Sequence, residues 1–126
     1  MTMPLTALSD TELYILEYLW DINEPQTFAQ LMNYFTTIEK KGWKKQTLNT
    51  FLLHLTQKGY LTLSSTGTRR LYAPSITKEA YQQTYAREIV KTSFDSSLTT
   101  FVSAFTGGQK ITPQERDELL DYLKGL

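Results

Sequence analysis

The side chains best suited to chemistry in this sequence of 126 residues lie between residues 39 and 72. That segment holds seven basic residues and one acid, Glu39, so its net charge is +6 although the formal net charge of the whole chain is zero. The basic residues are Lys40, Lys41, Lys44, Lys45, Lys58, Arg69 and Arg70. A basic segment in a neutral chain indicates one face that binds an anion, such as the phosphate backbone of a nucleic acid.

The sequence offers few residues suited to catalysis or metal binding. The sequence has no cysteine, which excludes a disulfide framework, a thiolate zinc site and a cysteine nucleophile. Its only histidine is His54, so a multi-histidine metal site is excluded and a Ser-His-Asp triad could form only there. We therefore expect no enzymatic activity, no metal and no cofactor.

A helix predicted over residues 45–58 must position most of the candidate side chains. Its apolar stripe consists of Leu48, Phe51, Leu52 and Leu55, and its opposite face carries Gln46, Asn49, Thr50, Leu53 and His54. Gln and Asn can bond an adenine edge in the major groove, and Thr or Leu can contact a thymine methyl. A recognition helix enters the groove by its N-terminus, which favours Gln46, Thr47 and Thr50 as base readers. The same pattern is also typical of an ordinary solvent-exposed helix face.

Basic side chains flank this helix on both sides. Lys40, Lys41, Lys44 and Lys45 lie beside its N-terminus and are expected on phosphates, although a solvated lysine cluster is the alternative. Arg69 and Arg70 follow the polar tip at residues 64–68, which separates two short strands predicted at residues 61–63 and 71–73. Since neighbouring strand residues point to opposite faces, we expect one arginine to reach DNA and the other not.

Two earlier helices complete the N-terminal part. Capping boxes at Ser9–Glu12 and Thr27–Gln30 predict a helix over residues 9–21 and another that starts at Thr27. Three helices followed by a hairpin are the order of a winged helix-turn-helix. Trp20 and Trp43 could stack on bases, but their positions favour core packing. The expected fold class is mainly α with a small β-hairpin.

Residues 77–126 read as an all-helical tail whose apolar stripes have little to cover them in one chain. A second copy of the tail is the natural cover, so we expect a homodimer. The expected dimerisation residues are Tyr81, Tyr85, Phe94, Leu98, Phe101, Phe105, Leu119 and Leu123. This reading predicts a winged-helix DNA-binding domain over residues 1–75 and a helical dimerisation region over residues 76–126.

The sequence contains neither a run of about 18–20 apolar residues nor an N-terminal signal-peptide pattern. We therefore expect a cytoplasmic protein without a membrane partner.

Several motifs together resemble the penicillinase-repressor family of winged-helix transcriptional regulators, the BlaI/MecI/CopY type. They are Leu-Ser-Asp-Thr-Glu at 8–12, Leu19-Trp20-Asp21, Thr47-Leu-x-Thr50 with Leu55 and Lys58-Gly59, Tyr72-x-Pro74, and Ile111-Thr-x-x-Glu115 with Glu118-Leu119. The resemblance covers residues 8–124. It implies a sequence-specific repressor that acts as a homodimer on a pseudo-palindromic operator. The alternative is a winged-helix module that binds protein without specific DNA binding.

The resemblance also implies how such a repressor is released. Relatives that control β-lactamases are inactivated by proteolysis in the C-terminal segment, which makes a regulatory protease a further expected partner. The cleavage dipeptide of those relatives aligns with Ala104-Phe105, where alanine replaces the usual asparagine. Copper-responsive relatives sense metal through cysteines, which this sequence lacks. His54 stands where arginine is common, and the glycine-arginine of the wing tip is Gly67-Thr68 here.

Overall fold

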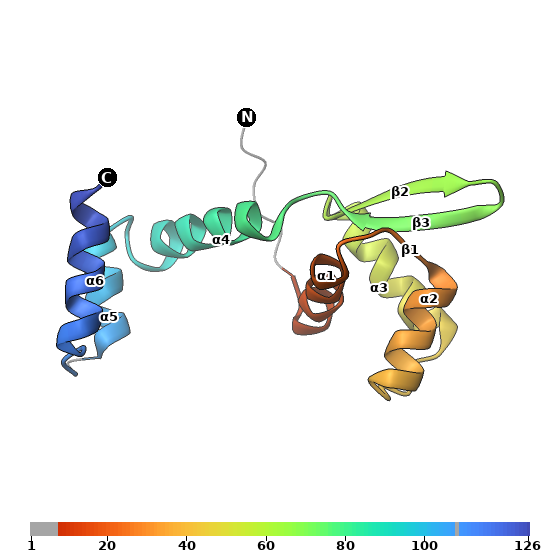
Figure 1. The fold of residues 1–126 in the computed structure, drawn as a ribbon, viewed down its shortest axis with the longest axis horizontal. Helices are drawn as coiled ribbons and strands as arrows, with labels where there is room; N and C mark the ends of the chain where they lie inside the picture. The colour runs from red at the N-terminus through yellow and green to blue at the C-terminus, as the bar shows by residue number, and fades with distance from the viewer. Residues whose placement is uncertain (1–7, 108) are drawn as a thin grey trace. The chain divides into compact units, whose positions relative to one another are not determined.

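The computed structural model describes residues 8–107 and 109–126 (Figure 1). Contacts within the chain divide it into two compact units, the first ending at Thr84 and the second running from Tyr85 to Leu126. The described part is mostly helical and has one small antiparallel sheet, which confirms the predicted fold class.

The helices of the first unit begin where the sequence predicts. They are α1 (Asp10–Ile22), α2 (Phe28–Asn33) and α3 (Lys45–Gln57), and a π-helix (Tyr34–Ile38) lies between α2 and α3. Ser9 and Thr27 cap α1 and α2, and both capping boxes are complete. Each box satisfies two amides that would otherwise lack a partner, which fixes the first turn of its helix. The π-helix continues directly from α2 and was not predicted.

The sheet has three strands in the order β1-β3-β2. β1 (Gln26–Thr27) pairs with β3 (Arg69–Pro74), and β3 pairs with β2 (Leu61–Thr66). The strands of the hairpin are longer than predicted, because Thr66 pairs with Arg69 and leaves only a two-residue turn. Gly67 in this turn has a φ of 62°, which a residue without a side chain adopts at little cost. The wing is therefore paired up to its tip.

The core of the first unit lies between the helices and the sheet. Its fully buried side chains are Ile15, Leu16, Leu19, Leu31, Phe35, Leu48, Leu52 and Leu55. Trp43 packs on Phe35 and Phe51, with ring centroids 5.1 and 5.4 Å away, so it is a packing residue as predicted. Trp20 packs against this core as well, and its indole N–H donates to the Ile76 carbonyl at 2.9 Å. The base-stacking alternative is not needed for either tryptophan.

Tyr81 was predicted at a dimer seam, and the structure places it in the core of the first unit instead. Its side chain is only 7% exposed, and its ring lies 5.5 Å from that of Trp20 and 6.1 Å from that of Tyr60. The first unit therefore extends through the first turns of α4 (Lys78–Ser93). The first unit thus ends at Thr84, whereas the DNA-binding domain was predicted to end at residue 75.

The second unit contains the end of α4, then α5 (Leu98–Thr106) and α6 (Pro113–Lys124). Ser97 and Thr112 cap α5 and α6 through their hydroxyl groups. Several apolar side chains of α5 and α6 are exposed in the single chain, namely Leu98, Val102, Phe105, Leu119, Leu120, Tyr122 and Leu123. Among the helices of residues 8–107 and 109–126, none is long and apolar enough to cross a membrane.

Candidate nucleic-acid interface

Helix α3 has one buried face and one exposed polar face. Leu48, Leu52 and Leu55 are at most 1% exposed and anchor the helix in the core. The other face is exposed and presents Gln46, Asn49, Thr50, Leu53 and His54, as the sequence predicts. This anchoring orients a row of amide, hydroxyl and imidazole groups toward solvent on a rigid element, which is what base readout requires.

The start of α3 differs from the starts of α1 and α2. Lys44 occupies its N-cap position, and no side chain makes a capping hydrogen bond there. The first turn carries Lys45 and no acid. Backbone amides at such a helix end keep partial positive charge and are available to an anion. Lys44 and Lys45 are both exposed beside these amides, so the end of α3 can bind a phosphate.

Two threonines of the predicted set have restricted roles. The Thr50 hydroxyl donates to the Gln46 carbonyl at 2.9 Å. The Thr50 methyl group is therefore the part of this side chain that can contact an apolar group of a ligand. Thr47 is half-buried, in contrast to the exposed Gln46. Gln46 and Asn49 are therefore the side chains of this face whose amide groups can donate to and accept from a base edge.

Two of the three remaining lysines of the basic segment, Lys41 and Lys58, are engaged within the chain. The Lys41 ammonium lies 4.4 Å from the centroid of the Tyr14 ring, a cation–π contact. Lys58 forms an ion pair with Glu12 in which Nζ and Oε1 are 2.7 Å apart. The structure thus separates Lys44 and Lys45, which project from the helix start, from two lysines that bind other parts of the first unit.

Arg69 and Arg70 lie at the start of β3, directly after the wing turn, and both are exposed. Both border a shallow groove whose other side is the start of α2; the groove is lined by Thr27, Phe28, Ala29, Gln30, Thr68, Arg69, Arg70 and Tyr72. The expectation that only one arginine reaches DNA stays a prediction.

Sequence reasoning missed a group of side chains just before α3. The Tyr34 hydroxyl donates to Glu39 Oε1 at 2.8 Å, and Tyr14 also hydrogen-bonds this carboxylate. These bonds hold the pKa of Glu39 below its usual range, and they raise the pKa values of Tyr14 and Tyr34 to about 12. The available signal was that Glu39 is the single acid in the basic segment.

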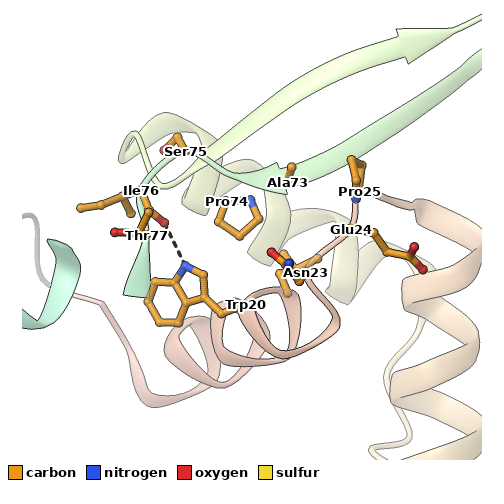
Figure 2. Close-up of a pocket in the computed structure, with 10 residues that line it drawn as sticks. Trp20, Asn23, Glu24, Pro25, Ala73, Pro74, Ser75, Ile76 and Thr77 are labelled. Carbon is orange, nitrogen blue, oxygen red and sulfur yellow. Dashed lines mark hydrogen bonds between the residues drawn. The ribbon is translucent and has the colours of Figure 1, made fainter. Parts of the chain in front are cut away.

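A separate cavity lies where the end of α1 meets the end of β3 (Figure 2). Trp20, Asn23, Glu24 and Pro25 line one side, and residues 73–77 line the other. Its lining includes an acid and no basic residue, so this cavity is no extension of the phosphate-binding surface. In the described part of the chain, no group of three His, Cys, Asp or Glu side chains could hold a metal ion.

The remaining predicted dimerisation residues belong to the second unit. Tyr85, Leu98, Phe105, Leu119 and Leu123 are exposed in the single chain, and Phe105 is 79% exposed. Phe94 and Phe101 are half-buried against each other, with ring centroids 5.4 Å apart. These positions leave an apolar surface on the unit.

Comparison with known proteins agrees with this arrangement. The family model described as "Penicillinase repressor" matches residues 8–125. The chain belongs to the penicillinase repressor family. The penicillinase repressor of Bacillus licheniformis is 25% identical to this family member over 123 residues, which are 95% of this chain and 91% of that protein.

Two solved structures resemble this penicillinase-repressor family member. The DNA-binding domain of the repressor BlaI aligns with a TM-score of 0.53 and 25% identity over 64% of this chain and 94% of that one. The monomeric form of Bacillus licheniformis BlaI, solved in complex with the blaP half-operator, aligns with a TM-score of 0.51 and 25% identity over 61% and 90%. These likenesses confirm the predicted winged-helix fold.

Proposed function

We propose that this protein is a DNA-binding transcriptional repressor that acts as a homodimer on a pseudo-palindromic operator. The observation that carries the proposal is the exposed polar face of α3, which begins at an uncapped helix end between Lys44 and Lys45. It occurs in a member of the penicillinase repressor family, and a similar repressor was solved on half-operator DNA. Family membership supports a regulator and not an enzyme.

Each side chain of the interface has a role in this proposal. Gln46 and Asn49 read base edges by hydrogen bonds, and the Thr50 methyl contacts thymine. Lys44 and Lys45 bind phosphates on either side of the uncapped helix end, and they supply affinity that depends on salt. Thr47 is a further base reader at the helix start, and the remaining backbone contacts come from Lys41, His54 and one of Arg69 and Arg70.

The exposed apolar surface of α5 and α6 supports the homodimer. Leu98, Phe105, Leu119 and Leu123 remain in water in one chain, and a second copy covers them with the same surface by two-fold symmetry. Residues 85–126 then act as the dimerisation region, and the first unit acts as the DNA-binding domain. Two half-sites should lie about one or two helical turns apart, with roughly 10 bp in each turn.

Repression then follows from occupancy, because a dimer on its operator blocks RNA polymerase. This mechanism places the protein in the cytoplasm with its DNA. Cleavage within the dimerisation region would release the operator, since dimer and operator affinity are linked. Because Ala104 replaces the usual asparagine at the cleavage position, we propose that a different protease or signal acts here.

The experiment is a footprint on the DNA upstream of the protein's own gene, followed by gel-shift titration on the protected sequence. Gln46→Ala should weaken binding to that operator by about 1–3 kcal/mol and leave binding to random duplex nearly unchanged. Gln82→Ala, which removes an exposed glutamine of α4 outside the proposed interface and the proposed dimerisation region, is the matched control. Equal losses on both duplexes would place Gln46 on the backbone, and binding that ignores salt would favour the protein-interaction alternative.

A further inference from the structure

We infer that Glu39 is a positioning residue for DNA binding: its carboxylate fixes the basic loop at residues 40–44 in front of α3. The inference rests on the proposed function. It assigns a role to the one acid in the basic segment, where electrostatics alone would disfavour an acid.

The carboxylate joins two elements that precede the loop. It accepts a hydrogen bond from Tyr34, the first residue of the π-helix, at 2.8 Å, and it also hydrogen-bonds Tyr14 from α1. Tyr34 is itself held, because its ring stacks on that of Tyr18 with centroids 3.6 Å apart and planes 14° apart. Glu39 is therefore attached to side chains whose positions the helices determine.

The loop beyond Glu39 follows from that anchor. The Glu39 amide donates to the Tyr34 carbonyl and the Lys41 amide to the Phe35 carbonyl, both at 2.9 Å. The Lys41 ammonium lies over the Tyr14 ring, the same tyrosine that binds Glu39. Lys40 has a φ of 53°, a left-handed conformation that a residue with a side chain keeps only when its surroundings enforce it. These contacts hold the start of the loop as far as Lys41, and Trp43 holds its end by packing on Phe35 and Phe51 just before Lys44.

Two effects of Glu39 on DNA affinity have opposite signs. Its negative charge repels phosphate, so removing the charge alone should strengthen binding to every duplex. Its anchoring orders the loop before DNA arrives, so removing the anchor should weaken binding by the cost of ordering the loop. Fixing one backbone residue costs about 1–2 kcal/mol, which corresponds to roughly tenfold in affinity. The sign of the change therefore identifies which effect dominates.

The test uses the full chain and three variants: Glu39→Gln, Tyr14→Phe with Tyr34→Phe, and all three changes together. We expect Glu39→Gln and the double tyrosine variant each to weaken binding to the operator and to random duplex by roughly tenfold. In the double tyrosine background, Glu39→Gln should no longer weaken binding, because only the repulsive charge is then removed. Glu17→Gln on α1, which removes an exposed acid without a loop to anchor, is the matched control.

A second measurement needs no DNA. Trypsin should cut after Lys40 or Lys41 faster in Glu39→Gln and in the double tyrosine variant than in the wild type, while the unfolding midpoint changes little. Tighter duplex binding by Glu39→Gln, or an unchanged cutting rate, would overturn the inference. A wild type that binds no duplex would instead refute the proposed function. The trypsin measurement would still test the anchoring in that case, because it needs no DNA.

Discussion

Replacing Lys58 by methionine tests how the first unit is held together. The Lys58 ammonium lies 2.7 Å from Glu12 Oε1, and this bond joins residues that are 46 positions apart in the sequence. Glu12 is 3% exposed, and its other oxygen, Oε2, is buried without a hydrogen-bond partner among the described residues. Without Lys58, the carboxylate would keep the Ser9 amide, 2.8 Å away, but would lose its counter-charge.

The magnitude follows from this burial. Breaking a fully buried ion pair by removing one partner costs about 3–5 kcal/mol. The Lys58 side chain is 27% exposed, so water partly screens the pair. We therefore expect Lys58→Met to lower the free energy of unfolding by about 2 kcal/mol at pH 7. Lys78→Met, which removes an exposed lysine of α4, should cost less than about 0.5 kcal/mol.

The stability lost in Lys58→Met should depend on pH, and the pKa of Glu12 determines the direction of this dependence. Burial alone would raise the pKa of the Glu12 carboxyl, but hydrogen bonds from Lys58 and Ser9 outweigh it and hold the pKa below its usual 4.5. A lowered folded-state pKa contributes stability that is complete above pH 4.5 and is lost as the pH falls through the lowered value. The difference between wild type and Lys58→Met should therefore be largest near neutral pH and should shrink in acid.

The assay is urea unfolding followed by tryptophan fluorescence at fixed protein concentration. Both tryptophans, Trp20 and Trp43, lie in the first unit, so the signal reports that unit alone. A loss below about 0.5 kcal/mol at pH 7, or the same loss at pH 3 and pH 7, would refute the reasoning.

Three further predictions concern the interface and the two units. Changing both Lys44 and Lys45 to alanine should weaken binding to all duplexes alike and lower the salt slope by about one unit for each lost contact; an unchanged slope in titrations at several salt concentrations would remove them from the phosphates. A fragment ending at Ser75 lacks the Tyr81 contacts with Trp20 and Tyr60, so in urea unfolding it should be less stable than a fragment ending at Thr84 by about 3 kcal/mol. Equal stability of the two fragments would contradict the placement of Tyr81. Phe105→Ala should weaken the dimer by about 3–5 kcal/mol in sedimentation equilibrium and operator affinity with it, whereas an intact dimer would place the seam elsewhere.

Local signals in the sequence predicted much of the first unit. The capping boxes at Ser9 and Thr27 located two helix starts, because the cap bonds involve residues only three positions apart. β1 was missed because two residues show no alternation. The ion pair between Glu12 and Lys58 depends on tertiary packing, which spacing does not encode.

Helix α4 shows where periodicity in the sequence is a poor guide to burial. Tyr81 and Tyr85 are four residues apart and look like one stripe, yet Tyr81 is buried in the first unit and Tyr85 is 47% exposed. Which of two tyrosines on one helix is covered depends on what the helix packs against, and that is non-local. The candidate interface on α3 was predictable because its buried leucines fix the opposite face.

The exposed apolar surface of α5 and α6 sets how the proposed repressor responds to its own abundance. If a second copy covers this surface, as proposed above, the active species is a pair, and the concentration of active repressor rises with the square of the subunit concentration while most subunits are single. Halving the subunit supply in that range removes about three quarters of the pairs. A modest dilution, as in a growing cell whose synthesis has paused, would then open the operator more sharply than a monomeric repressor could.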